Sequence, residues 1–208
     1  MKYNTFLVTP GACGTHMMAR LIGLREHSNG RAAPTTVEAA HATAKYSRHR
    51  RNPDIRDADH VIYMYSNPYD TILSFHRRGF FNGPGHCQHI DGDVEYFMKH
   101  VSGGCTAEEY LKLPIDSFGI EDHFYSYYNF DDRKYNIMFV KYESLEKTIP
   151  EVLKWLNSSH KLSEFKFKKR NSDWTDQPEN IKELLEKKFG NHKRFLDTLP
   201  DVFYKNKK

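Results

Sequence analysis

Two glycines near the N-terminus, Gly11 and Gly14, have the spacing of a turn that could bind an anion. Glycine has no Cβ, so the backbone of such a turn can come close to a ligand. Where a helix follows, its unpaired N–H groups and its dipole both favour a phosphate or sulfate group, and Thr15 adds a hydroxyl donor. The turn therefore predicts an anion site, although an ordinary strand–turn–helix connection would need the same glycines.

The segments around this turn have the patterns of a buried strand and a helix. Residues 6–8 are an apolar run, and apolar side chains recur at helical spacing between Met17 and Leu24. A Walker A loop ends in Gly-Lys-Ser/Thr, but this chain has no lysine between Lys2 and Lys45. The third glycine of a Rossmann fingerprint is also missing. Neither nucleotide-binding motif explains the turn.

Two further strand patterns follow along the chain, each ending in a polar turn. Residues 60–65 and 135–142 are apolar runs typical of buried strands, and helix patterns follow them over residues 71–78 and from residue 143 onward. Strands that alternate with helices indicate a parallel sheet with helical crossovers. We therefore predict the α/β class, as a three-layer fold with a short central parallel sheet flanked by helices.

Ligands of open parallel sheets bind beyond the carboxyl ends of the strands. The turn at residues 11–16 is therefore expected to meet the turns at residues 66–70 and 142–144 at this edge. A basic segment at residues 168–170 could fold over the same edge. Together these segments predict one site for an anionic ligand.

The composition is that of a mildly basic globular protein. The chain has 208 residues, so we expect one domain, residues 1–208, with its own core. A net charge of +4 suits a small anionic ligand and is too weak to indicate nucleic acid. Three cysteines do not suggest a disulfide framework, and no apolar run approaches a membrane span. We expect a cytoplasmic protein without a membrane anchor.

Local patterns predict several more elements. A capping-box pattern followed by alanines predicts a short helix within residues 35–44. The basic residues 45–51 are expected either to form a solvated loop or to contribute to a site. Further on, periodicity predicts a helix over residues 181–189 that ends at Gly190, and an apolar packing segment over residues 195–203.

A long glycine-rich segment, residues 79–104, lacks periodicity apart from a helix pattern near residues 94–101. Long loops in compact domains are usually mobile or functional, so we expect this one to lie over a substrate site. The segment contains His86, Cys87 and His89, but their spacing fits no standard zinc pattern. We therefore expect no metal.

The order of these segments resembles that of the sulfotransferases that use 3′-phosphoadenosine 5′-phosphosulfate (PAPS). Their first loop, Pro-Lys/Arg-Ser-Gly-Thr-Thr, corresponds to residues 12–16, and their Arg-Asn/Asp-Pro-x-Asp motif with a following serine corresponds to residues 66–70 and Ser74. Their Arg-Tyr-Glu-Asp-Leu corresponds to residues 141–145, and their basic stretch before Gly-Asp-Trp to residues 168–174. The four matches, in order over most of the chain, imply a P-loop NTPase-like sulfotransferase fold.

The resemblance implies a role in cofactor binding for three groups of residues. The first loop would hold the 5′-phosphosulfate of PAPS. Two serines on the second motif and its helix would hold the 3′-phosphate, and the basic segment would clamp it. In chain order these residues are Gly11, Ala12, Cys13, Gly14, Thr15, His16, Ser66, Ser74, Lys168, Lys169 and Arg170.

The resemblance also implies a general base that removes the proton of an acceptor hydroxyl or amine during in-line sulfuryl transfer. His49 is the first candidate, because it lies before the second strand, about where cytosolic members place their base. Glu38 is the second, because carbohydrate and tyrosyl members use a glutamate after the first helix. The alternative for His49 is a surface histidine without a role.

Three substitutions depart from the family pattern. Ala12 stands where members have a lysine or arginine that contacts the leaving-group oxygen, and Ser66 stands where an arginine grips the 3′-phosphate. His16 replaces a phosphate-binding threonine, although a protonated histidine can also hold an anion. Losing a charge contact made in the transition state lowers catalysis by orders of magnitude.

Three functions follow, in order of preference. The first is a PAPS-dependent sulfotransferase acting on a small-molecule or carbohydrate acceptor. The second is a catalytically impaired protein of the same fold that binds a nucleotide or a sulfated ligand. The third is a P-loop kinase relative, against which the missing phosphate-binding lysine counts.

Overall fold

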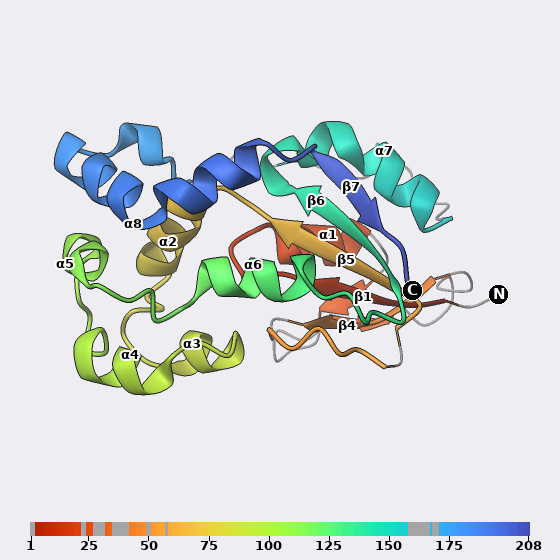
Figure 1. The fold of residues 1–208 in the computed structure, drawn as a ribbon, viewed down its shortest axis with the longest axis horizontal. Coiled ribbons are helices and arrows are strands. Elements are labelled where there is room, and N and C mark those ends of the chain that lie inside the picture. The colour runs from red at the N-terminus through yellow and green to blue at the C-terminus, as the bar shows by residue number, and fades with distance from the viewer. Residues whose placement is uncertain are drawn as a thin grey trace.

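A five-stranded sheet forms the centre of the fold in the computed structural model of this chain (Figure 1). The structure describes residues 3–21, 24–26, 32–34, 42–48, 51–56, 58–157, 167 and 171–208. The strands lie in the order β4 (Ala42–Arg48), β1 (Tyr3–Val8), β5 (His60–Tyr65), β6 (Asn136–Lys141) and β7 (Val202–Lys205). The first four are parallel, and β7 pairs antiparallel with β6. The predicted α/β class is therefore confirmed.

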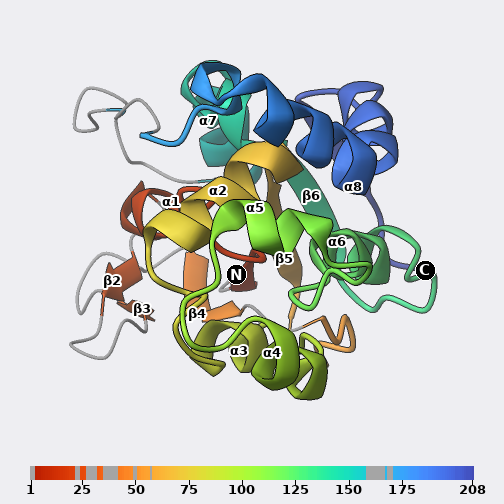
Figure 2. The ribbon, with the colours of Figure 1, turned by 90° about the vertical axis from the view of Figure 1, so that its left-hand side faces the viewer.

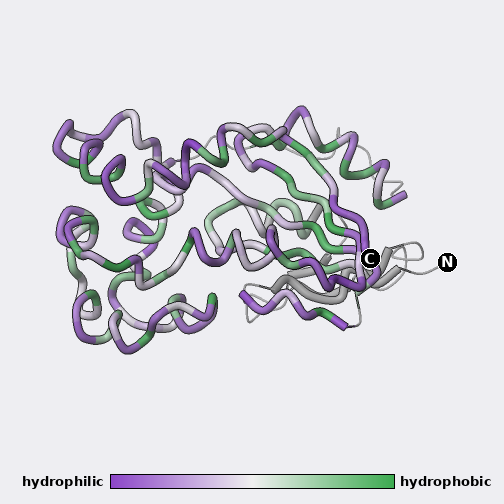
Figure 3. Tube along the Cα trace, viewed as in Figure 1, coloured by the Kyte–Doolittle hydropathy of each residue, from purple (hydrophilic) through white to green (hydrophobic). Residues whose placement is uncertain are grey.

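Helices cover both faces of this sheet (Figures 1 and 2). Because successive side chains of a strand point to opposite faces, Leu7 and Ile62 lie in one apolar cluster and Phe6 and Val61 in another. Figure 3 shows apolar residues concentrated along β5 and β6. The helices of the first cluster are α1 (Thr15–Leu21) and α7 (Leu145–Trp155), and those of the second are α6 (Ile120–Tyr128) and the end of α8 (Glu179–Asp197).

A group of helices extends the molecule beyond the carboxyl ends of the strands, toward the left of Figure 1. It has its own apolar core, which includes the buried rings of Phe75, Phe97 and Phe118. None of the described helices is both long and apolar enough to cross a membrane. The helices of this group are α2 (Pro68–Arg77), α3 (Gly85–His89), α4 (Val94–His100), α5 (Ala107–Lys112) and the first half of α8.

The remaining described elements are short. Strands β2 (Leu24–Glu26) and β3 (Ala32–Pro34) form an antiparallel pair. Two 3₁₀ turns, η1 (Tyr142–Ser144) and η3 (Trp174–Asp176), precede α7 and α8. The first of them, η1, is the third of the turns that were expected at the ligand edge of the sheet.

The helix predicted within residues 35–44 is wrong where the structure describes it. Residues 42–44 begin β4. Residues 45–48, for which a solvated loop was one of two expectations, continue this strand alongside β1. The other residues of the predicted helix lie outside the described part of the chain. This segment therefore forms a strand because it pairs with the edge of β1, and long-range strand pairing outweighs a local helix signal.

The predicted helix end at Gly190 is also wrong, because α8 continues to Asp197. A Cβ at Gly190 would lie 2.4 Å from Glu186 Oε1 and 3.1 Å from Arg194 Nη1. These two side chains form an ion pair that crosses over the glycine. Gly190 therefore makes room for this pair inside the helix, and the apolar residues beyond the helix form β7 rather than a loose packing segment.

The glycine-rich segment at residues 79–104 is more ordered than predicted. The expected helix near residues 94–101 is confirmed as α4, whereas α3 was not predicted from the sequence pattern. Cys87 of α3 is buried and donates a hydrogen bond to Ser117 O at 3.2 Å, and burial raises the pKa of its thiol to about 12. Cys87 therefore has a structural role.

His192 of α8 is buried against the rings of Phe124 and Tyr125, and its Nδ1 has no hydrogen-bond partner among the described residues. Burial lowers the pKa of His192 from 6.5 to about 4. The unfolded state therefore binds a proton at a higher pH than the folded state, and stability falls as the pH drops below 6.5.

Because His192 is buried, we expect the free energy of unfolding to fall by about 2 kcal/mol between pH 7 and pH 5 through this residue alone. The measurement is urea unfolding at both pH values for the natural protein and for His192→Leu, which keeps an apolar side chain among the rings. The variant is expected to lose less stability on acidification by that amount. Equal losses in the two proteins would contradict the prediction.

Candidate active site

The turn that follows β1 has an unusual backbone. Gly11 (φ +104°), Ala12 (φ +55°) and Gly14 (φ +72°) all have positive φ angles. The Gly11 N–H donates to Thr9 Oγ1 at 2.9 Å, and the Cys13 thiol donates to Gly11 O at 2.9 Å. Left-handed residues within a short turn direct successive N–H groups into a concave surface that suits an anion. This backbone is therefore compatible with the predicted anion site.

The turns after the three central strands meet, as expected from the sequence. Cys13 Sγ of the first turn lies 3.6 Å from Ser66 Oγ of the second. A Cβ on Gly14 would lie 2.5 Å from the Tyr142 ring of the third. The N–H of Asn67 donates to Glu143 Oε1 at 2.9 Å, which joins the second turn to the third.

The three turns meet at the place in the sheet topology where open α/β sheets have a ligand crevice. From β1 the chain runs through α1 toward β4 on one side, and from β5 it runs through α2 toward β6 on the other. Because β1 and β5 are neighbours, their connections leave the sheet edge in opposite directions. Open α/β sheets bind ligands at such a switch point. The first and second turns therefore lie where this architecture places a site.

Ser66 and Ser74, the two serines with an implied phosphate contact, are buried, at 5% and 2% exposed. The hydroxyl groups of Ser66 and Thr71 share a hydrogen bond of 2.7 Å, and Thr71 also donates to Asn67 O at 3.0 Å. Asn67 in turn caps α2 by accepting the Tyr69 N–H at 3.0 Å. Ser66 therefore connects the glycine turn to the start of α2.

His86 of α3 covers the glycine turn. Its Nε2–H donates to Pro10 O at 3.1 Å, and its ring stacks on Phe80 at 4.1 Å and meets Phe75 edge-on at 4.5 Å. A Cβ on Gly11 would lie only 2.7 Å from His86 Cε1. No group of three or more metal-ligating side chains occurs in the described parts of the chain.

The segment that follows the basic residues is attached to α2. Ser172 is buried and accepts a hydrogen bond from Arg77 Nε at 3.0 Å. The N–H of Trp174 donates to Asp70 Oδ1 at 2.8 Å. These contacts hold residues 172–174 beside the helix that begins at the second turn.

Of the other predicted site residues, two lie at the start of α1 and five lie outside the described part of the chain. Thr15 begins α1 and is half-buried, and His16 follows it in the helix. The five remaining residues lie outside the part of the chain that the structure describes. They are the candidate bases His49 and Glu38, and the basic residues Lys168, Lys169 and Arg170.

Known proteins give no guide to this site. A comparison with models of known protein families found no match, and a comparison with curated sequences found no significant relative. The meeting of the three strand ends is therefore the observation from which a function can be inferred.

Proposed function

We propose that this protein is a PAPS-dependent sulfotransferase with a P-loop NTPase-like sulfotransferase fold. The observation that carries the proposal is the junction of the three turns, with Cys13 Sγ 3.6 Å from Ser66 Oγ. The resemblance assigns those same turns to the two ends of the cofactor. The turn at Gly11 to Gly14, with its positive φ angles, would hold the 5′-phosphosulfate.

The transfer would proceed in line. The acceptor oxygen or nitrogen would bond to sulfur as the bond between sulfur and the phosphate oxygen breaks, which releases adenosine 3′,5′-bisphosphate. The acceptor proton would pass to His49 or Glu38. The backbone donors of the turn would stabilise the charge on the leaving phosphate, and the basic residues 168–170 would clamp the 3′-phosphate.

The second candidate, an impaired protein that binds a nucleotide or a sulfated ligand, is favoured by one specific observation. Ala12 supplies no cation, and the Ser66 hydroxyl is already bonded to Thr71. Both positions carry cations in the family that the chain resembles. A P-loop kinase relative is the third candidate, and it lacks the lysine that such enzymes place on the phosphates.

The proposal predicts that adenosine 3′,5′-bisphosphate stabilises the protein and that ATP does not. A ligand that binds only the folded state at a hundredfold excess over its Kd adds about 2.7 kcal/mol of unfolding free energy. For a chain of this size we expect a rise in Tm of a few degrees. The measurement is thermal unfolding with each nucleotide at millimolar concentration.

Three outcomes are distinguishable. A rise with the bisphosphate alone, followed by its release from PAPS in the presence of acceptors, supports the sulfotransferase. A rise without turnover supports the impaired protein. No rise with the bisphosphate would contradict the sulfotransferase and make the impaired protein, with another ligand, the leading candidate. A rise with ATP alone would favour a kinase relative.

A further inference from the structure

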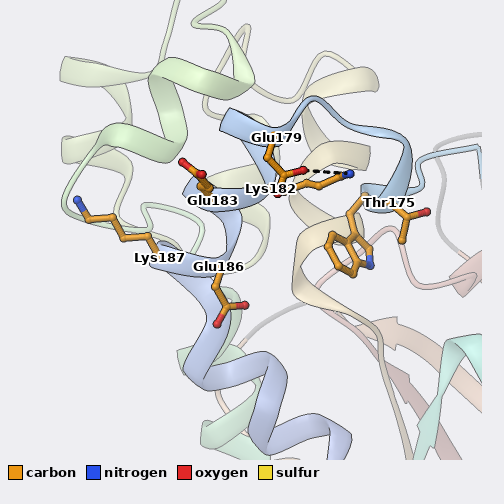
Figure 4. Close-up of a pocket in the computed structure, with 7 residues that line it drawn as sticks. Thr175, Glu179, Lys182, Glu183, Glu186 and Lys187 are labelled. Atoms are coloured by element: carbon orange, nitrogen blue, oxygen red, sulfur yellow. Dashed lines mark ion pairs between the residues drawn. The ribbon is translucent and has the colours of Figure 1, made fainter.

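A groove of about 640 Å³ lies between η3 and the first half of α8, on the side of the molecule toward which β5 points (Figures 1 and 4). Its volume is within the range of sites for small molecules. Trp174 and Thr175 line it from η3, and charged side chains of α8 line the rest. None of its lining residues belongs to the three strand-end turns.

Trp174 is a fixed aromatic surface in the groove. Its backbone N–H is bonded to the buried Asp70, and its half-buried indole meets the ring of Tyr69 edge-on at 5.2 Å. The hydroxyl of Tyr69 is bonded to Glu186, another lining residue. Since Asp70 lies in the first turn of α2, the indole is tied to the helix that starts at the strand-end junction.

The polar lining contains nearly equal numbers of positive and negative groups. Glu179 and Lys182 form an ion pair of 3.6 Å at one end, and Glu183 and Lys187 extend toward the other end (Figure 4). With Glu186 there are three carboxylates and two ammonium groups. Neither a strongly cationic nor a strongly anionic ligand is favoured by this balance, because each would meet like charges.

We propose that this groove binds a neutral oligosaccharide. Carboxylates accept hydrogen bonds from sugar hydroxyl groups and ammonium groups donate to them, so a hydroxyl-rich ligand uses both kinds of side chain. The Glu179–Lys182 pair presents an acceptor beside a donor, which complements two neighbouring hydroxyl groups. The apolar face of a sugar ring packs on the indole of Trp174, because aromatic rings supply large apolar contact areas.

The saccharide is then the acceptor of the proposed transfer, and that part of the inference rests on the proposed function. The groove is attached to the strand-end turns, because the Trp174 N–H donates to Asp70 of α2, the helix that begins at the second turn. Binding itself does not depend on PAPS and can be measured without it.

The test uses the two tryptophans of the chain, Trp155 and Trp174. In a Trp155→Phe protein the emission reports on Trp174 alone. Maltotriose, cellotriose and tri-N-acetylchitotriose are titrated, with trilysine and sodium sulfate as charged controls. We expect a saturable change in emission with at least one trisaccharide, and about tenfold weaker binding in a Glu179→Gln/Lys182→Met variant. Lys154→Met on α7, outside the groove, should leave binding unchanged.

The proposal is overturned if no trisaccharide changes the emission although acrylamide quenches it, or if trilysine or sulfate alone binds. Thermal unfolding with adenosine 3′,5′-bisphosphate on the same protein separates the two ideas. Saccharide binding without nucleotide binding supports the groove and contradicts the sulfotransferase. Nucleotide binding without saccharide binding contradicts the groove alone.

Discussion

Replacing Gly11 with alanine is expected to destabilise the protein by about 3 kcal/mol and to weaken anion binding at the turn. Gly11 has φ +104°, and a Cβ there would lie 2.7 Å from Cε1 and 3.0 Å from Nε2 of His86. A left-handed backbone costs an L-residue about 1–2 kcal/mol. Overpacking costs about 1–3 kcal/mol more. Urea unfolding measures the sum, and thermal unfolding with adenosine 3′,5′-bisphosphate measures the loss of binding.

A double-mutant cycle with His86→Ala separates the two costs. Without the imidazole, the methyl group of Gly11→Ala has room, and only the backbone cost remains. The same substitution should then cost about 1–2 kcal/mol. Equal costs in the two backgrounds would mean that His86 does not restrain the turn. Gly83→Ala is the matched control, because a Cβ at Gly83 meets nothing within 4 Å and its φ is not positive.

The central strands could be predicted because each carries its signal locally. Residues 60–65 and 136–141 are buried on both faces of the sheet, so they appear in the sequence as continuous apolar runs. The turns that end them are polar, and the parallel topology brings these turns together. The meeting of the first three turns was therefore predictable.

The edge strands could not be predicted in the same way. An edge strand has one neighbour, and β4 contains Lys45, Ser47 and Arg48 rather than an apolar run. The other edge, β7, has only four residues. Both strands depend on hydrogen bonds to partners that are distant in sequence, so no local pattern identifies them.

The contact between His86 and the glycine turn could not be predicted from the sequence either. Seventy-six positions separate His86 from Pro10, and the packing of Phe75 and Phe80 brings the imidazole to the turn. Cys87 and His89, beside it in the sequence, are metal-ligating residue types, but their spacing fits no standard zinc pattern. A long-range aromatic contact has no fixed spacing, whereas metal-binding motifs do.

Under the proposed function, Ala12→Lys is expected to raise the rate of sulfuryl transfer by about 10²–10³-fold. A cation at this position would stabilise the negative charge that develops on the leaving phosphate. Ala12 already has φ +55°, so lysine would carry the same backbone cost as the natural residue. Its aliphatic stem would pack along the apolar cluster around Ala12, which includes Tyr69 and Phe75.

Ala12→Met is the matched control, because it has a similar stem and no charge. The rate is measured as release of adenosine 3′,5′-bisphosphate from PAPS with phenolic and saccharide acceptors. Only the lysine variant should bind the bisphosphate more tightly, and this gain should shrink as salt is added, since dissolved ions screen the attraction between two charges. If both variants fold equally well and neither binding nor release differs between them, the turn does not hold the leaving phosphate. The resemblance to the sulfotransferases would then extend to the order of the segments and not to their chemistry.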